Sequence, residues 1–307
     1  MSFTQEVKQE VSTVELEACC KKAQTAALVQ LCSSLIIRDQ IFQLHIKTEN
    51  AATAKRIFQL LKERYGLDIS LQVVKKTNLK KNNIYTLEIK ETVIPILEDL
   101  ELWDKKGFKD HPSKQLTHKE CCARSYLAGA FLASGSLNSP QKSNYHLELS
   151  TQNEAHARFI QSLMDRFDLN AKKTTRRNQD VVYIKSSEKI SDFLRMIQAN
   201  NAVLDFEDVR IQRDFHNSFT RLDNCEVANE MKTLAASSKQ VTAIEQLIEK
   251  GLMESLDETS QAMAQLRLDN PEASLNELCE AYAQKTGIII SKSGMKHRLA
   301  KLIALNE

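Results

Sequence analysis

The 307-residue sequence is poor in the residues that break helices, because it contains only seven glycines and four prolines. It also has a single tryptophan, and aromatic residues make up 6% of the chain. No glycine loop of the GxGxxG or Walker type occurs, so nucleotide-driven chemistry of those kinds is unsupported. The scarcity of glycine and proline predicts that helices dominate the fold.

Long apolar runs are also missing. No stretch of the chain approaches the roughly 20 apolar residues that a bilayer-spanning helix needs. The first residues, MSFTQEVKQEV, lack the basic start and apolar run of a secretory signal. We therefore expect a cytoplasmic protein that has no membrane partner.

The seven cysteines are an odd number and include no CxxC pair. Four of them form two doublets, Cys19-Cys20 and Cys121-Cys122, whose adjacent members are too close for ordinary disulfide geometry. His118 precedes the second doublet, but no histidine precedes the first, and no second cluster of metal ligands is evident along the sequence. We expect small, buried cysteines at the start of packing helices, and neither a metal nor a cofactor.

The front of the chain is a tandem duplication. Residues 19–35 read CCKKAQTAALVQLCSSL, and residues 121–137, which lie 102 positions later, read CCARSYLAGAFLASGSL. The same offset aligns Arg56-Ile57-Phe58-Gln59 with Arg158-Phe159-Ile160-Gln161. Identical cysteine doublets followed by matching helical segments are hard to produce by chance in an ungapped register, so the repeat decides the fold prediction.

Each repeat is predicted to be an αββαββα unit, with one antiparallel sheet covered by helices, which makes the fold class α+β. Hydrophobic periodicity indicates strands that alternate at period two and helices with apolar stripes. The expected elements are a helix at 15–34 and 117–134, a strand after a polar turn at 41–46 and 145–149, a helix at 50–65 and 152–167, strands at 69–74, 84–89 and 181–184, and a helix at 92–102 and 188–200. Asn50 and Thr151 are the expected caps of the middle helices. The strands align best at an offset of 103, which places a one-residue insertion in the preceding turn of the second copy.

The rest of the chain is predicted to be a small all-α domain behind a connector. The expected domains are a first repeat at 1–112, a second repeat at 113–200, a polar connector at 201–237 and a helical domain at 238–307. The helical domain should contain short helices at 238–250, 256–268, 274–285 and 292–304. Ser274 and Ser291 are the expected caps of the last two, and Gly287 should end the third.

Residues 127–135, LAGAFLASG, resemble the LAGLIDADG motif of homing endonucleases. The resemblance implies two αββαββα repeats whose motif helices pack together at a pseudo-twofold axis, where small residues such as Gly129 allow close approach. In the active family, the residue before the final glycine is an acid that binds divalent metal, one from each repeat. Here that position is Ser134, and its counterpart in the first copy is Cys32. Neither side chain offers a carboxylate oxygen to Mg²⁺, so we expect the scaffold without the nuclease chemistry.

An enzyme remains the alternative function class. A metal-dependent endonuclease with displaced ligands could recruit Glu17, Glu120 and Glu148, which lie near the ends of the predicted helices. No symmetric pair of acids occupies the motif position. A third alternative makes the repeat domain a scaffold for protein interaction, with the C-terminal domain alone on DNA.

The C-terminal residues, from about Ser274 to Glu307, resemble a helix-turn-helix. Between Glu280 and Glu307 there is no acidic residue, and an exposed basic helix suits the DNA major groove. Met295, Leu299, Leu302 and Ile303 form the apolar stripe of the second helix. The residues expected to contact double-stranded DNA are Ser291, Lys292, Ser293, Lys296, His297, Arg298 and Lys301.

Two basic connections occupy equivalent places in the repeats. Their residues are Lys75, Lys76, Lys80 and Lys81 in the first copy and Lys172, Lys173, Arg176 and Arg177 in the second. Such residues fit secondary DNA contacts at the hairpins of a saddle-shaped sheet. They fit ordinary solvated turns equally well.

Taken together, a degenerate two-repeat LAGLIDADG domain followed by a helix-turn-helix resembles the WhiA family. The matching segments are Arg221–Asn229 (RLDNCEVAN), Lys232-Thr233, Leu266-Arg267-Leu268, Ser274–Leu278 (SLNEL), Ser291–Gly294 (SKSG) and His297-Arg298-Leu299. The resemblance implies a non-enzymatic regulator of transcription that binds double-stranded DNA and is linked to cell division and chromosome segregation. It also implies a place on the nucleoid and leaves room for a protein partner on the repeat domain.

Overall fold

The computed structural model describes residues 1–38, 41–67, 69–75 and 83–305. The chain divides into two compact units, Met1–Arg213 and Asp214–Glu307. Each unit has its own hydrophobic core, one running from Val7 to Phe206 and the other from Ile244 to Leu302.

The first repeat follows a short helix, α1 (Phe3–Val11). Its elements are α2 (Ala18–Cys32), β1 (Ser33–Arg38), β2 (Ile41–Thr48), α3 (Ala51–Tyr65), β3 (Ser70–Lys75), β4 (Asn83–Ile89) and α4 (Val93–Asp99). The four strands form an antiparallel sheet in the order β1-β2-β4-β3. A small ribbon of β5 (Trp103–Asp104) and β6 (Gly107–Phe108) follows.

The second repeat has the same architecture. Its elements are α5 (Glu120–Ser134), β7 (Gly135–Leu137), β8 (Leu147–Thr151), α6 (Glu154–Asp165), β9 (Lys172–Arg176), β10 (Gln179–Ile184) and α7 (Ser187–Met196). Its strand order, β7-β8-β10-β9, repeats that of the first sheet. The predicted αββαββα duplication is thus confirmed.

Strand register confirms the inserted residue. Ser33 lies opposite Ile46 in the first sheet, and Gly135 lies opposite Leu149 in the second. The first member of each pair is offset by 102 residues and the second by 103. The extra residue therefore lies between the first two strands of the second repeat.

Three local predictions were wrong. The stretch expected to be a polar turn after the first helix of each repeat forms the strands β1 and β7. The expected connection at 172–177 is mostly strand β9, which leaves the turn to Arg177 and Asn178, both with positive φ. Helix α6 is capped by Asn153, not Thr151, because the Asn153 side chain accepts from the amides of the first turn while Thr151 ends β8. The predicted cap of α3, Asn50, is confirmed.

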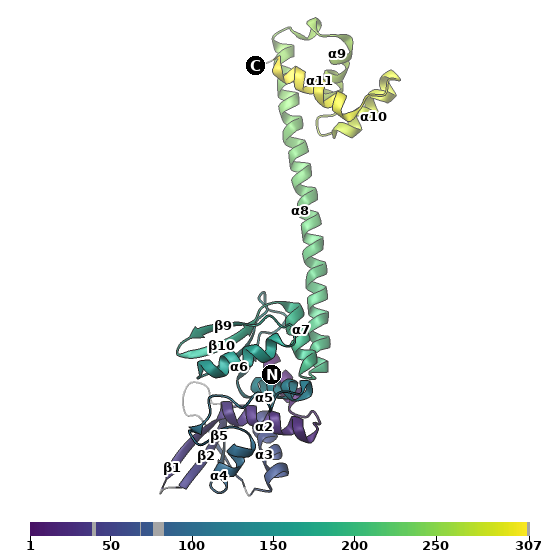
Figure 1. Ribbon diagram of the computed structural model, residues 1–307. Helices are drawn as coiled ribbons and strands as arrows, with labels where there is room; N and C mark the ends of the chain where they lie inside the picture. Colours follow the sequence, from purple (N-terminus) through teal and green to yellow (C-terminus); the bar gives the residue numbers. More distant parts are fainter. Residues whose placement is uncertain (39–40, 68, 76–82, 306–307) are drawn as a thin grey trace. The chain divides into compact units, whose positions relative to one another are not determined.

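Helices α2 and α5 pack against each other in the middle of the first unit (Figure 1). Leu28 and Val29 of α2 and Leu127 and Phe131 of α5 are fully buried. Both helices have little amphipathic character, because each is surrounded by the other helix, by its own sheet and by covering helices. This helix pair is the centre around which both repeats are organised.

The expected connector at 201–237 is instead part of one continuous helix, α8 (Asn200–Glu249), 50 residues long. It also contains most of the helix expected at 238–250. No glycine or proline occurs between residues 200 and 249, so nothing in the backbone interrupts the helix. Its middle shows no clear apolar period because both faces are exposed there, including Phe215, Phe219 and Leu222. The helix ends just before Gly251, which adopts a left-handed conformation at φ 68°.

The C-terminal unit contains the last turns of α8, a 3₁₀ turn (Met253–Ser255), α9 (Glu258–Asp269), α10 (Leu275–Thr286) and α11 (Lys292–Ala304). The predicted caps are confirmed, since the side chains of Ser274 and Ser291 accept from backbone amides and Gly287 ends α10 at φ 71°. Among the described residues, no helix has the length and apolar content that crossing a membrane requires.

Candidate nucleic-acid interface

Helix α11 is held by one buried stripe. Met295, Leu299 and Leu302 are nearly fully buried and pack with Leu278 and Tyr282 of α10 in the core of the C-terminal unit. The spacing of four and three residues puts these side chains on one side of the helix. Burying three large apolar side chains fixes which face of α11 points outward, and contributes about 1.5–3 kcal/mol for each side chain.

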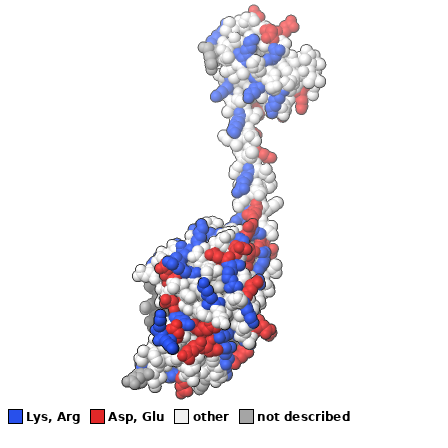
Figure 2. Space-filling view, viewed as in Figure 1, with Lys and Arg blue, Asp and Glu red and all other residues white. Residues whose placement is uncertain are grey.

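The opposite face of α11 is basic and exposed. Ser293, Lys296, His297 and Lys301 are all exposed, and no acidic residue lies between Glu280 and Glu307. On the face drawn in Figure 2, lysine and arginine side chains are spread over the C-terminal unit. The structure therefore brings these predicted residues together on one helical surface.

Arg298 differs from its neighbours because it has an acidic partner within the unit. Its guanidinium Nη1 lies 3.4 Å from Oδ1 of Asp257, the cap of α9. Hydrogen bonds from the Ser260 amide and hydroxyl, with the nearby Arg298, lower the pKa of Asp257. The ion pair turns Arg298 toward α9, and Asp257 offsets part of its charge at the surface of the unit.

The N-terminus of α11 has the geometry of an anion site. Ser291 caps it by accepting a hydrogen bond from the Gly294 amide at 3.1 Å, and its hydroxyl lies 3.0 Å from that of Ser293. The free amides of a first helical turn and the helix dipole favour a phosphate oxygen there. Lys292, which opens the helix, is exposed beside them.

The turn between α10 and α11 carries two residues that the sequence analysis missed. Ile288 is 60% exposed and Ile289 is 91% exposed. Their exposure could have been predicted from the sequence, because the two isoleucines belong to neither the apolar stripe of α10 nor that of α11. Apolar side chains at such a position suit contact with the methyl groups of thymines.

The two motif positions are occupied by Cys32 and Ser134, at the C-terminal ends of α2 and α5. Ser134 donates a hydrogen bond within its own helix, to the Ala130 carbonyl oxygen at 3.4 Å. Desolvation raises the pKa of the Cys32 thiol to about 12, so it stays neutral at physiological pH. The charged group beside Cys32 is Lys8 of α1, whose ammonium lies 5.9 Å from the centre of the Phe131 ring. Lys8 is thus a buried basic residue next to one of the two motif positions.

Helices α2 and α5 approach each other closely enough to exclude a side chain at Gly129. A Cβ atom built on Gly129 would lie 2.7 Å from the Gln24 carbonyl oxygen and 2.9 Å from the Ala27 Cβ atom. Farther along the pair, the Ser125 hydroxyl donates to the Cys20 carbonyl oxygen at 2.8 Å. These contacts fix the register of the two helices.

The same packing brings the cysteine doublets together. The sulfur atoms of Cys19, Cys20, Cys121 and Cys122 all lie within 4.8 Å of one another. The prediction that no second group of metal ligands exists was wrong, because each doublet is the second group for the other. The duplication could have predicted this cluster. The doublets occupy equivalent positions on the two motif helices, and helices that pack together at a pseudo-twofold axis bring equivalent positions together.

These four thiols are free and differ in burial. Cys20 and Cys122 are buried, whereas Cys19 and Cys121 are exposed. Burial raises the pKa of Cys122 to about 12 and also raises that of Cys20. A hydrogen bond with Cys122 lowers the pKa of Cys19.

The acids of the alternative endonuclease are dispersed. Glu120 forms an ion pair with Arg124 on the exposed side of α5, and Glu148 lies 2.9 Å from His146 on the second sheet. Glu17 precedes α2 and is exposed. In the described ranges, the cysteine cluster is the one group of three or more such ligand residues close enough to share a metal ion.

The basic residues predicted to make secondary DNA contacts do not share one surface, and those on β9 divide between the two faces of the second sheet. Lys172 and Arg176 alternate with Lys173 along β9 and are exposed. Lys173 lies 2.6 Å from Glu154 of α6 and therefore faces the helical layer. Arg177 is exposed in the turn, and Lys75 is exposed at the end of β3. Lys76, Lys80 and Lys81 lie outside the described residues.

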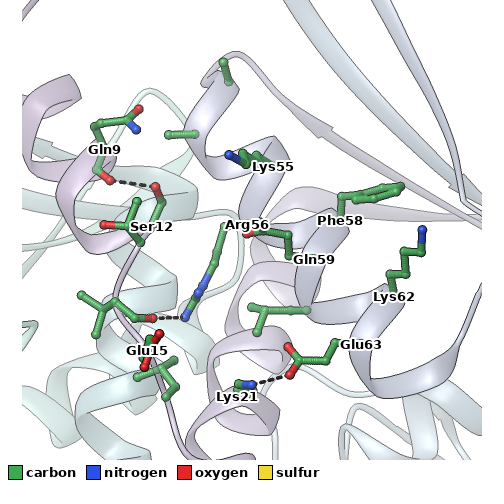
Figure 3. A pocket seen from close by; sticks show the side chains of 16 residues that line it. Gln9, Ser12, Glu15, Lys21, Lys55, Arg56, Phe58, Gln59, Lys62 and Glu63 are labelled. Carbon is green, nitrogen blue, oxygen red and sulfur yellow. Dashed lines mark hydrogen bonds and ion pairs between the residues drawn. The ribbon is translucent and has the colours of Figure 1, made fainter.

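A large open pocket of about 910 Å³ lies between α1, the segment after it and α3 (Figure 3). Arg56 spans its inner wall, donating to the Gln24 side chain at 2.7 Å and the Val14 carbonyl oxygen at 2.8 Å. Lys21 and Glu63 form an ion pair of 2.5 Å at its edge. These contacts join α3 to α2 and to the segment after α1, which indicates a structural role for Arg56, Lys21 and Glu63.

Comparison with known proteins covers nearly the whole chain. Residues 18–103 match the WhiA N-terminal LAGLIDADG-like domain, residues 123–216 the WhiA LAGLIDADG-like domain, and residues 219–306 the WhiA C-terminal HTH domain. Proteins named "Probable cell division protein WhiA" from Bacillus licheniformis and Bacillus subtilis are each 44% identical over 100% of this chain and 96% of their own length. The corresponding protein of Macrococcus caseolyticus is 43% identical with the same coverage.

Solved structures agree on the fold. The crystal structure of full-length WhiA from Thermatoga maritima matches with a TM-score of 0.59 at 22% identity, covering 100% of this chain and 98% of that one. A crystal structure of a WhiA N-terminal LAGLIDADG domain matches with a TM-score of 0.51 at 20% identity, covering 64% of this chain and 90% of that one. On the 44% identity over its full length and the three domain matches, this chain belongs to the WhiA family.

Proposed function

We propose that this protein binds double-stranded DNA through its C-terminal helix-turn-helix and regulates transcription, without being an enzyme. The observation that carries the proposal is the exposed face of α11, where Lys296, His297 and Lys301 lie opposite the buried stripe. The names of its relatives support a role linked to cell division. We extend this role to chromosome segregation and to a place on the nucleoid in the cytoplasm.

The proposed docking places α11 in the major groove. Ser293 and His297 lie four residues apart on the exposed face, within reach of base edges, while Lys296 and Lys301 flank them toward the phosphates. A phosphate oxygen at the amides that Ser291 leaves free would anchor the helix end. Arg298 is expected to contribute less, because its guanidinium is paired with Asp257.

The repeat unit then supplies additional contacts, either to DNA through the open faces of its sheets or to a protein partner. Its motif positions, Cys32 and Ser134, support a scaffold that has lost metal-dependent cleavage. The endonuclease alternative is tested with supercoiled plasmid in Mg²⁺ and Mn²⁺. Sustained cutting that EDTA abolishes would overturn the non-enzymatic part of the proposal and leave DNA binding intact.

The test of the DNA interface is a fluorescence anisotropy titration of the full chain with a duplex selected from genomic DNA, repeated at several salt concentrations. We expect Lys296→Ala and Lys301→Ala each to weaken binding and to lower the slope of log affinity against log salt by about 1, as for loss of one phosphate contact. Arg298→Ala should have a smaller effect on the slope.

The matched control is Lys239→Ala, which removes an exposed lysine of the same unit on α8. Its affinity and salt slope should equal those of the unchanged protein. If Lys296→Ala and Lys301→Ala behave like this control while circular dichroism shows intact folding, α11 is not the DNA-binding helix.

A further inference from the structure

The cluster of four cysteines joins two helices that come from different repeats. In α2, which begins at Ala18, Cys19 and Cys20 are the second and third residues; in α5, which begins at Glu120, Cys121 and Cys122 hold the same places. The Ser125–Cys20 hydrogen bond, one turn into α5, fixes the register that brings the doublets together. All four sulfur atoms consequently lie within 4.8 Å of one another.

We propose that Cys19, Cys20, Cys121 and Cys122 form a four-thiolate site for a single Zn²⁺ ion, which clasps the N-terminal ends of α2 and α5. Four cysteines are the ligand set of structural zinc sites, which are tetrahedral and closed. In a tetrahedron with Zn–S bonds of about 2.3 Å, the sulfurs are about 3.8 Å apart. Sulfurs within 4.8 Å of one another reach that spacing by small side-chain rotations.

The short distances between the four sulfur atoms favour a single metal ion over an iron–sulfur cluster. An iron–sulfur cluster places irons and bridging sulfides between its cysteines, so it holds their sulfur atoms much farther apart than a single ion does. Sulfurs that already lie within 4.8 Å leave room for one ion. Thiolate ligands exclude Mg²⁺ and Ca²⁺, which prefer oxygen, and favour soft or borderline ions such as Zn²⁺.

The backbone around the cluster suits bound thiolates. Helices α2 and α5 both begin without a side-chain cap, since neither Glu17 nor Lys119 accepts from the first-turn amides. By contrast, Asn50 and Asn153 cap the next helix of each repeat. The positive ends of two helices therefore converge on the four sulfurs, where they stabilise negative charge.

Solvent reaches the cluster from two sides, which gives the ion a path of entry. A pocket of about 640 Å³ is lined by Cys19 and Cys122 together with Lys114 and Lys119. A second pocket, of about 360 Å³, is lined by Cys20 and Cys121. The lysines in the first pocket offset part of the double negative charge that four thiolates leave around one Zn²⁺.

The test uses the full-length protein, reduced and freed of metal, and cobalt(II) chloride as the probe. We expect one Co²⁺ per chain, with the strong visible absorption bands of tetrahedral thiolate coordination, and displacement of Co²⁺ by added Zn²⁺. Zinc should also raise the thermal unfolding temperature of the unchanged protein, because it binds only the folded state with high affinity. A zinc chelator should reverse the rise.

Cys121→Ser and Cys19→Ser remove exposed thiols and so should leave the fold intact, as circular dichroism would show. Each should abolish the cobalt bands. Each should also weaken Zn²⁺ binding by more than about 100-fold, because removing a residue that merely hydrogen-bonds to a metal ligand already weakens metal affinity by up to about 100-fold. The matched control is Cys225→Ser, an exposed cysteine on α8, which should retain them.

Three results would overturn the proposal. The first is that the reduced protein takes up no cobalt or zinc at micromolar concentration. The second is that the bands persist in both Cys121→Ser and Cys19→Ser. The third is that the reduced protein binds no metal and, when exposed to air, forms a disulfide between Cys19 and Cys122, which would indicate a redox role for the cluster.

Discussion

Gly129 of α5 lies so close to Gln24 of α2 that a Cβ atom on the glycine would sit 2.7 Å from the Gln24 carbonyl oxygen. The obstructing atom is backbone in the middle of a buried helix, so it cannot rotate away. The motif glycine is therefore a packing residue here, independent of any catalytic chemistry. This contact holds the two repeats at the distance that also gathers the four cysteines.

We expect Gly129→Ala to lower the free energy of unfolding of the first unit by about 1–3 kcal/mol, although alanine favours helix formation. Overpacking must push α2 and α5 apart or distort them. Urea unfolding followed by circular dichroism measures the change. Ser134→Ala, five residues along the same helix, should stay within about 0.5 kcal/mol. Equal effects of the two substitutions would contradict close helix packing at Gly129.

Much of the site and the fold could be predicted because duplication doubles every local signal. Alternating strands, apolar helix stripes and the caps Asn50, Ser274 and Ser291 follow from short-range chemistry that each segment carries in itself. The exposed face of α11 followed from the same reasoning, since a buried stripe at helical spacing defines its opposite side.

What could not be predicted depends on contacts distant in the sequence. Strand β1 is paired along its length with β2 yet mostly exposed, and its apolar residues Leu35, Ile36 and Ile37 are consecutive, so they lack the alternation that marks a half-buried strand. Helix α8 lacks a clear apolar period because the side chains of its middle, Phe215, Phe219 and Leu222 among them, are exposed. Arg267, noticed only as part of the family resemblance, is 2% exposed and donates to the Asn270 and Ala273 carbonyl oxygens. No local pattern reveals such a buried arginine.

Lys8 makes the folding stability of the protein depend on pH in the alkaline range. Burial lowers the pKa of its ammonium from 10.5 to about 8, so between these values the unfolded chain retains a proton that the folded chain has lost. Folding stability should therefore rise with pH in this window and be lowest below pH 8. Between pH 7 and pH 9 the gain should be about 1 kcal/mol.

Lys8→Met should remove this gain, because it deletes the buried charge and keeps an unbranched apolar side chain beside Phe131. Stability curves in urea at pH 7 and pH 9, under reducing conditions, provide the measurement. The comparison stops at pH 9 because Cys32, whose pKa is raised to about 12, opposes the effect as the unfolded thiol ionises. An identical pH dependence in Lys8→Met would show that Lys8 is not buried as a charge.

His156 makes folding stability depend on pH in the acid range. Burial, with a smaller effect of His111, lowers its pKa from 6.5 to about 4, and the Tyr126 hydroxyl lies 2.8 Å from its Nε2 atom. Between these pH values the unfolded chain binds a proton that the folded chain excludes. Stability contributed by neutral His156 is therefore present above pH 6.5 and is lost as the pH falls toward 4.

His156→Asn should reduce the loss of stability between pH 6.5 and pH 4 by up to about 3 kcal/mol, after its own cost at neutral pH is subtracted. Thermal unfolding monitored by circular dichroism across this range tests the prediction. Carboxyl groups titrate in the same window in both proteins, so only the difference between the two slopes is informative. Parallel slopes would mean that the histidine ionises freely in the folded state.

The second sheet allows a sharp test of whether the repeat unit touches DNA, because β9 presents lysines to both faces. Lys172 is exposed on the open face with Arg176, whereas Lys173 faces α6 and lies 2.6 Å from Glu154. If the open face lies on DNA, the double substitution Lys172→Ala/Arg176→Ala should lower the salt slope of binding by about 2. Lys173→Ala removes one positive charge from the same strand and should leave the slope unchanged. A fall of equal size in both variants would indicate a general charge effect, and no fall in either would restrict DNA contact to the C-terminal unit and favour a protein partner for the sheets.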